Sequence, residues 1–147
     1  MNKHHEKINI YLQILEKLDD QNLSRLTELL THNVIFSDPF NQTNGIPRFI
    51  KAISSVLEDT RDHSFQINQK AEFEFGVMIT WTLKMTPKHW IFKNQQIQIE
   101  GSSSILTDDS GFIIAHYDYW DTASTLYEKI PILGLALSKI RKKLEIK

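Results

Sequence analysis

The sequence predicts an α+β fold in which N-terminal helices pack on a strongly curved, mainly antiparallel sheet. Three observations support this prediction. Apolar residues recur every three or four positions up to about residue 60, as in amphipathic helices. They then alternate with polar residues from residue 63 to residue 120, as in half-buried strands. Asp108-Asp109-Ser110-Gly111 is a strong hairpin signal between the last two alternating runs.

The N-terminal part is predicted to hold three helices and one short strand. An apolar stripe runs through residues 4–19, and a shorter leucine stripe follows it, with residues 31–33 expected to close the second helix. Residues 34–38 form a β-rich run that ends at Pro39. After a loop, Pro47 suits the first turn of the third helix.

The second half is predicted to form strands followed by a helical tail. The four predicted strands are residues 63–75, 77–86, 96–107 and 112–120. Residues 122–145 return to a helical pattern, which Pro131 and Gly134 are expected to interrupt. The 147 residues are expected to form one domain, residues 1–147.

The last predicted strand carries the most distinctive chemistry of the chain. It places His116, Asp118 and Trp120 on one face, because side chains alternate along a strand. The side chains of His116 and Asp118 are expected to lie roughly 7 Å apart, with room for a partner or a water between them. On a pocket wall they would form an acid/base pair. Alternatively, one of them hydrogen-bonds buried backbone or a tyrosine hydroxyl.

Composition limits the classes of function. Apolar residues make up 41% and charged residues 24% of the chain, as in ordinary soluble proteins. The sequence has no cysteine, so disulfides and thiolate chemistry are excluded, and a cytoplasmic location is expected. The net charge of −1 argues against a nucleic-acid partner. The histidines lack metal-ligand spacing, so no metal is expected, and no cofactor motif is present.

The C-terminal tail is both basic and amphipathic. Residues 139–147 contain five cations and one glutamate, a local charge of +4 that leaves −5 for the rest of the chain. An apolar stripe at residues 133, 137, 140 and 144 has lysine and arginine opposite. Three interpretations remain open for this helix: it docks on its own domain or a dimer mate, it covers a pocket as a lid, or it contacts an anionic membrane.

The order of elements, with four short motifs, resembles the nuclear transport factor 2-like superfamily. The motifs are Asn22-Leu23, Phe36-Ser37-Asp38-Pro39 followed by Gly45, the Asp108–Gly111 hairpin, and the strand that runs into Trp120-Asp121. The resemblance covers about residues 5–121, so residues 1–121 would form the characteristic cone and residues 122–147 a helical tail. Within the superfamily, the sequence particularly resembles SnoaL-like proteins. The resemblance implies a cone-shaped sheet closed by helices, a largely apolar pocket and a homodimer formed through the sheet.

Ketosteroid isomerase, a member of this superfamily, implies a role for Asp38. Its catalytic base sits in an Asp-Pro after the first short strand, which Asp38-Pro39 matches. Two residues of that enzyme donate hydrogen bonds to the oxyanion, and ungapped counting places Ile14 and Ser103 at their positions. Tyr11, one helical turn from Ile14, is therefore the candidate replacement donor. Asp38 also has a simpler interpretation, as a turn residue that caps local amides.

The epoxide hydrolases of the superfamily imply a role for Asp118. The aspartate on their last strand matches Asp118, but Trp81 and Leu83 stand where their arginine and second aspartate would be. Epoxide hydrolysis by that machinery is therefore not expected. The candidate catalytic residues are Asp38, Asp118 and His116. The candidate ligand-binding residues are Tyr11, Ile14, Phe36, Phe40, Trp81, Ser103 and Trp120.

Three hypotheses follow for function. The first is a cofactor-free isomerase, cyclase or dehydratase that binds an apolar small molecule and uses an aspartate base beside a carbonyl. The second is a non-catalytic carrier or sensor of a lipid-like or steroid-like ligand, associated with a membrane surface. The third is a dimeric scaffold whose core is filled and has no cavity.

Overall fold

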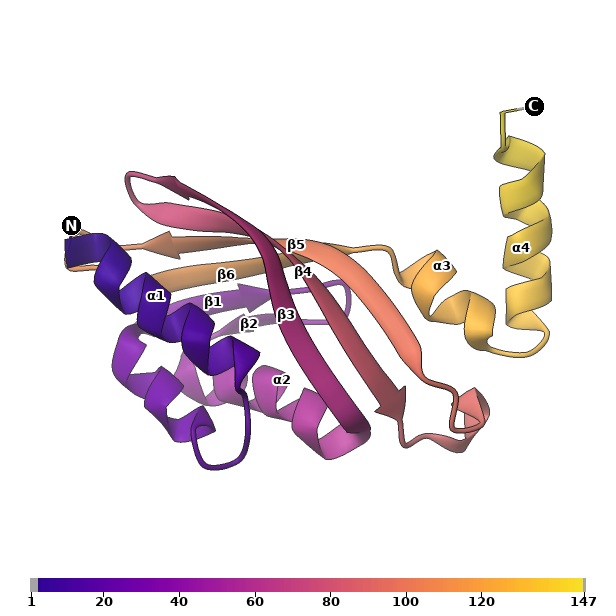
Figure 1. Ribbon diagram of the computed structural model, residues 1–147, viewed down its shortest axis with the longest axis horizontal. Coiled ribbons are helices and arrows are strands. Elements are labelled where there is room, and N and C mark those ends of the chain that lie inside the picture. The colour runs from indigo at the N-terminus through magenta and orange to yellow at the C-terminus, as the bar shows by residue number, and fades with distance from the viewer. Residues whose placement is uncertain (1–2, 147) are drawn as a thin grey trace.

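The predicted α+β architecture is confirmed. The computed structural model describes residues 3–146 as helices packed on a curved, open sheet of six strands, with a separate C-terminal helix (Figure 1). The helices are α1 (Lys3–Glu16), η1 (Leu23–Leu29), α2 (Ile46–Asp59), η2 (Trp90–Phe92), α3 (Thr122–Thr125), η3 (Tyr127–Lys129) and α4 (Leu133–Leu144). The strands are β1 (Leu30–Ser37), β2 (Gln42–Asn44), β3 (Thr60–Phe73), β4 (Gly76–Pro87), β5 (Ile97–Thr107) and β6 (Ile113–Trp120).

The sheet is mixed, with one parallel pair inside an antiparallel arrangement. Its strand order is β2-β1-β6-β5-β4-β3, and only β1 and β6 run parallel to each other. The predicted hairpin between β5 and β6 is present, since the Asp108 carboxylate accepts hydrogen bonds from the amides of Ser110 and Phe112. Gly111 has φ +80°, a conformation that glycine adopts at little cost.

Two predictions about local structure were wrong. Residues 31–33 do not close a helix, because β1 begins at Leu30, where it pairs with Ile113 of β6. The predicted loop before α2 contains β2, a short edge strand that pairs with the end of β1. Both errors have the same cause, because strand pairing and not local alternation decides the conformation of these segments. β2 pairs with the neighbouring end of β1, and residues 31–33 lie at the register shift between the pairings of Leu30 and Ile35 with β6.

Helices α1 and α2 cover one face of the sheet and create the core. The apolar stripe of α1 buries Ile8, Tyr11 and Leu15, and Phe49 of α2 is fully buried. Both helices lie on the same side of the curved strands (Figure 1). The sheet therefore bends around the helices, and the space between them is bounded by apolar side chains.

Gly101 of β5 gives the sheet room for Trp81 of β4. The two residues are register partners, and a Cβ at position 101 would lie 2.5 Å from the indole of Trp81 and 2.9 Å from the carbonyl oxygen of Tyr119. We expect Gly101→Ala to lower the free energy of unfolding by about 1–3 kcal/mol, because the indole must leave its position. Urea denaturation measures this. Ser102→Ala, on the other strand face, is the control, and equal stability of both variants would contradict the account.

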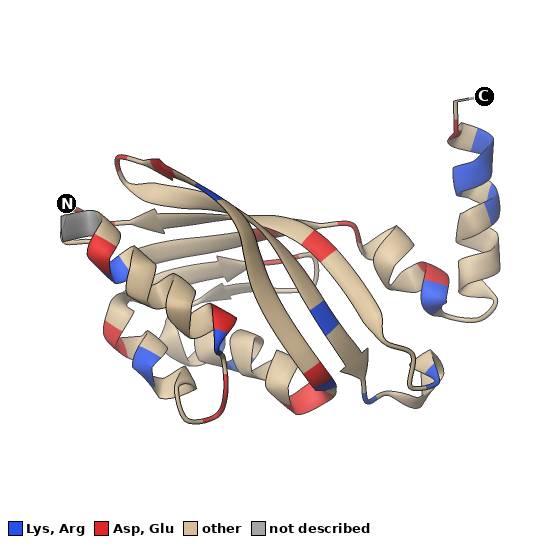
Figure 2. Cartoon of the chain, viewed as in Figure 1, with Lys and Arg blue, Asp and Glu red and all other residues tan. Residues whose placement is uncertain are grey.

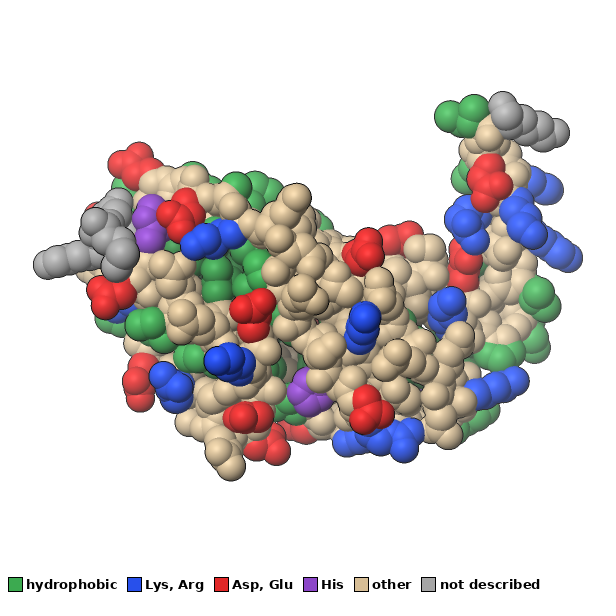
Figure 3. Space-filling view, in the orientation of Figure 1, with side chains coloured by type: hydrophobic (Ala, Val, Ile, Leu, Met, Phe, Trp, Pro, Cys, Tyr) green, Lys and Arg blue, Asp and Glu red, His purple; other side chains and the backbone are tan. Residues whose placement is uncertain are grey.

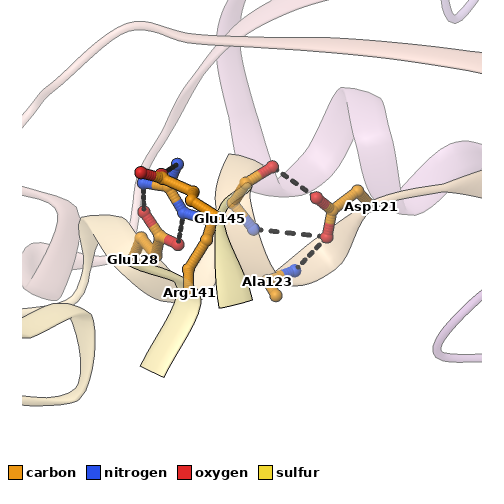
Figure 4. A network of polar contacts seen from close by, with 6 residues as sticks. Asp121, Ala123, Glu128, Arg141 and Glu145 are labelled. Atoms are coloured by element: carbon orange, nitrogen blue, oxygen red, sulfur yellow. Dashed lines mark hydrogen bonds and ion pairs between the residues drawn. The ribbon is translucent and has the colours of Figure 1, made fainter. Parts of the chain in front are cut away.

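A small polar network joins the elements within the C-terminal segment (Figure 4). Asp121 caps α3 by accepting hydrogen bonds from the amides of Ala123 and Ser124 at 2.9 and 3.3 Å. Arg141 of α4 forms two hydrogen bonds with Glu128, at 2.8 and 2.9 Å. Gly134 packs so tightly that a Cβ there would lie 2.1 Å from the carbonyl oxygen of Glu128. These contacts join α4 to η3, and α4 stands away from the sheet (Figure 1).

Lys147, the last of the five tail cations, lies outside the described residues. Between residues 3 and 146, no helix has both the length and the apolar character that a membrane crossing requires.

Candidate functional site

A cavity of about 1020 Å³ opens between the curved sheet and its covering helices. This volume is at the upper end of the range typical of small-molecule sites. Its walls are mainly apolar and are formed by side chains from α1, α2, β1 and the long strands, among them Leu15, Phe36, Ile53, Phe65, Leu83 and Ile99. Such a wall favours an apolar ligand, because burial of its surface is the main driving force for binding.

One wall of this cavity contains a histidine–aspartate pair. The Nε2 atom of His116 lies 2.7 Å from Oδ1 of Asp118, and both residues line the cavity. The expected gap of roughly 7 Å between their side chains is therefore wrong. The backbone spacing allows the gap, but the two side chains lean toward each other on the strand face.

Tyr11 supports the pair from behind. Its hydroxyl lies 2.6 Å from Nδ1 of His116, and both groups are buried. When Nε2–H donates to Asp118, Nδ1 is the acceptor for the tyrosine O–H, so a neutral His116 satisfies both contacts. The chain Tyr11–His116–Asp118 thus fixes the imidazole in one orientation.

Asp118 is held from its other side by Ser103. The Ser103 hydroxyl donates to Oδ1 of Asp118 and accepts the indole N–H of Trp81 at 2.7 Å. Oδ1 therefore accepts two hydrogen bonds, whereas Oδ2 accepts none from the described residues. The Asp118 side chain is 19% exposed and lines the cavity. One carboxylate oxygen is thus anchored in the wall, and the other remains available to a ligand.

Burial controls the ionisation of Tyr11. Desolvation, and secondarily the negative charge of Asp118, raises the pKa of Tyr11 well above its usual value. The pKa of Tyr11 is therefore higher in the folded chain than in the unfolded chain. Ionisation of Tyr11 does not lower the free energy of unfolding below about pH 10, and it lowers this free energy as the pH rises further.

We expect Tyr11→Phe to remove this alkaline loss of stability. At neutral pH the variant should be less stable by about 1–3 kcal/mol, because Nδ1 of the buried His116 loses its donor. Urea denaturation at neutral and alkaline pH measures both effects. An unchanged pH dependence in the variant would show that Tyr11 is not the group responsible.

Asp38 occupies a different position and makes different contacts. Its Oδ1 accepts the backbone amides of Phe40 and Asn41 at 2.8 and 2.6 Å, and the Asn41 side-chain amide lies 3.1 Å away. These contacts form a turn at the edge of the cavity, where Asp38 is half-buried. The arrangement matches the turn-capping interpretation of Asp38, and most of its acceptor capacity is used locally.

The structure brings some predicted ligand-binding residues to the cavity and places others behind its wall. Phe36, Phe40, Trp81 and Trp120 line the cavity, as do the three predicted catalytic residues. The other three, Tyr11, Ile14 and Ser103, are buried and are not part of the lining.

His63 is a cavity residue that the sequence reasoning missed. It lines the cavity from β3, and its Nε2 lies 3.4 Å from the carbonyl oxygen of Leu18. A signal was present, because His63 is in phase with Phe65 and Ile67, which alternate on the inner face. Across residues 3–146, no group of three or more His, Asp or Glu side chains is arranged to hold a metal ion.

Comparison with solved structures identifies the class of fold. An NTF2-like protein from Burkholderia pseudomallei has a TM-score of 0.70 at 13% identity, covering 84% of this chain and 95% of that one. A steroid delta-isomerase from Pseudomonas aeruginosa has a TM-score of 0.66 at 17% identity, covering 98% and 95%. An epoxide hydrolase from M. tuberculosis, described as LEH-like, has a TM-score of 0.65 at 14% identity, covering 99% and 95%.

The cone-shaped sheet with its helices is therefore the nuclear transport factor 2-like fold, as the sequence motifs imply. Within that class, residues 8–116 match the family described as "Uncharacterized conserved protein (DUF2358)", and the chain belongs to this family. A comparison with curated proteins found no match.

Proposed function

We propose that this protein binds an apolar small molecule in its cavity and uses Asp118 as a general base beside a carbonyl group. The observation that carries the proposal is the position of the Asp118 carboxylate. One oxygen is anchored by Ser103 and His116, the other has no protein partner among the described residues, and the Asp118 side chain lines a large apolar cavity. A carboxylate in such surroundings is suited to proton transfer.

The reaction begins with transfer of one proton. Oδ2 of Asp118 takes a proton from the carbon next to the ligand carbonyl, the C–H bond breaks, and its electron pair forms the enolate. The negative charge then resides on the ligand oxygen. Where a C=C bond is conjugated with the enolate, return of the proton from Asp118 to the far carbon of that bond gives an isomer. Alternatively, attack by the enolate carbon on a second carbonyl of the same ligand closes a ring, and Asp118 returns its proton to the resulting alkoxide. No external oxidant or reductant is required.

The hydrogen-bonded residues around Asp118 act as positioning residues. Ser103 and His116 hold Oδ1, and Trp81 and Tyr11 hold those two residues in turn. The carboxylate is thereby fixed before the ligand arrives, which lowers the reorganisation needed for reaction. The fold itself is compatible with catalysis, since a steroid delta-isomerase and an epoxide hydrolase share it.

A second candidate function is a non-catalytic carrier for the same class of ligand. It is favoured by the placement of the proposed oxyanion donors. The hydroxyls of Tyr11 and Ser103 are buried behind the wall and already donate to His116 and Asp118. A carrier needs the apolar cavity and a single polar contact, and it needs no group that stabilises a developing oxyanion.

Deuterium exchange separates these two functions. The protein is incubated in D₂O with a panel of polycyclic ketones, and binding and deuterium uptake next to the carbonyl are measured by mass spectrometry. The enzyme proposal predicts uptake above the rate in buffer for the ketones that bind. Binding without uptake across the panel would identify a carrier. Absence of binding would contradict both candidates.

A further inference from the structure

One end of the molecule exposes large apolar side chains on two separate elements. This end, here called the docking end, comprises residues 88–95 around η2 and residues 126–146 with η3 and α4. Trp90 is 79% exposed, and on the tail Ile132 and Leu144 are 82% and 79% exposed. The two elements are adjacent, since residues 91–95 and 128–138 line a common groove. Exposed apolar groups concentrated in this way mark an interaction surface.

The docking end is also strongly basic. It contains seven lysines and arginines against two glutamates, a net charge of +5, which leaves −6 for the remainder of the chain. Figure 2 shows the blue segments concentrated along α4, and Figure 3 shows their side chains projecting from the part of the tail that stands away from the body. Among the described residues, Lys142 and Lys143 form no ion pair. These charges are therefore available to a partner.

The geometry of α4 matches that of an interfacial helix. Leu133, Leu137, Ile140 and Leu144 recur every three or four residues on one stripe. Lys143 flanks the stripe and is long enough to keep its ammonium group in water while its methylenes contact apolar surface, and Lys139 lies toward the opposite side of the helix. The indole of Trp90 is amphipathic and suits the boundary between water and hydrocarbon.

We propose that the docking end binds the surface of a bilayer that contains anionic lipid. An anionic surface complements the charge of +5, and the apolar stripe and Trp90 enter the headgroup region. A second copy of this chain, docked through the same end, would bring two positive ends together and is disfavoured by their repulsion. The side chains of this end thus select a lipid surface in preference to self-association.

The cavity reaches the same end of the molecule. His89, Phe92 and Leu126 belong to the docking end and also line the cavity. A bilayer bound there would face this part of the cavity wall, so an apolar ligand has a short path out of the lipid. This last step rests on the proposed function, whereas membrane binding by the docking end does not.

Vesicle co-sedimentation tests the proposal. The full chain is mixed with vesicles of phosphatidylcholine alone or of phosphatidylcholine with phosphatidylserine, and the bound fraction is measured. Binding is expected only with phosphatidylserine and should weaken as salt is added. Replacement of Lys142 and Lys143 by glutamine should weaken binding about fivefold for each lysine. Trp90→Ala should weaken it roughly tenfold through lost apolar burial.

A matched control removes the same charge elsewhere. Arg25 and Arg48 are exposed and lie outside the docking end, so their replacement by glutamine should leave vesicle binding unchanged. Circular dichroism checks that each variant is folded. The proposal is overturned if phosphatidylserine does not increase vesicle binding by the unmodified chain. It is overturned as well if the docking-end variants bind these vesicles as strongly as the unmodified chain does. It is also overturned if sedimentation shows a dimer that Ile140→Glu converts to monomer, because a second copy would then cover the stripe.

Discussion

Asp118→Asn is expected to lower the rate of deuterium uptake by about 10²–10⁴-fold, the usual contribution of a general base. Ligand affinity should stay within about threefold, because asparagine preserves the volume of the side chain and an oxygen that accepts from Ser103. The measurement is uptake beside the carbonyl of a bound polycyclic ketone, under conditions that saturate the protein. The expected result separates the loss of chemistry from the loss of binding.

Asp38→Asn is the matched control for this experiment, since Asp38 also lines the cavity. Its carboxylate is used by the amides of Phe40 and Asn41, so the substitution should affect the local turn and leave the rate within about tenfold. If Asp38→Asn abolishes uptake and Asp118→Asn does not, the roles of the two aspartates have been assigned the wrong way round.

Phe49→Ala is expected to lower the free energy of unfolding by about 3–5 kcal/mol. The ring is fully buried and lies 5.6 Å from Phe36 and 6.4 Å from His116, measured between ring centroids. Its removal leaves a void beside the cavity wall and takes away packing that holds the imidazole. Because domains of this size are stable by only about 5–15 kcal/mol, the shift in urea midpoint should be large.

Phe40→Ala provides the comparison on the rim of the cavity. Phe40 is 53% exposed, and its ring lies 5.4 Å from Trp120 in an edge-to-face contact. Its truncation should change stability by less than about 1 kcal/mol while weakening the binding of an aromatic or polycyclic ligand. Equal destabilisation by the two substitutions would contradict the placement of Phe49 in the core.

The sequence alone predicts which residues of β6 share one face, because the alternation of side chains along a strand depends only on neighbouring residues. Alternation placed His116, Asp118 and Trp120 together, and all three line the cavity. The contact between Tyr11 and His116 was not predictable in this way, since 105 residues separate them and only the folding of α1 onto the sheet joins them. The sequence left open a hydrogen bond from His116 or Asp118 to a tyrosine hydroxyl, but it did not indicate which tyrosine.

The two ends of β1 show a different limit. Its C-terminal half, Val34–Ser37, is rich in β-branched and aromatic residues and was predicted as a strand. Residues 31–33 are polar and resemble a helix end, yet they belong to the strand, at the register shift between the pairings of Leu30 and Ile35 with β6. For Asp38, both the capping and the catalytic interpretation were consistent with an Asp-Pro pair. The hydrogen bonds from residues 40 and 41 show the capping contacts, which the sequence alone could not.

A crystal structure with the tightest-binding polycyclic ketone would test the account most directly. Ligand density is expected between Phe36, Trp81 and Trp120, with the carbon next to the carbonyl within reach of Oδ2 of Asp118. Ser103 and His116 are also expected to keep their hydrogen bonds to Oδ1. A ligand bound outside the cavity, or a cavity filled by its own side chains, would contradict the proposed role of Asp118.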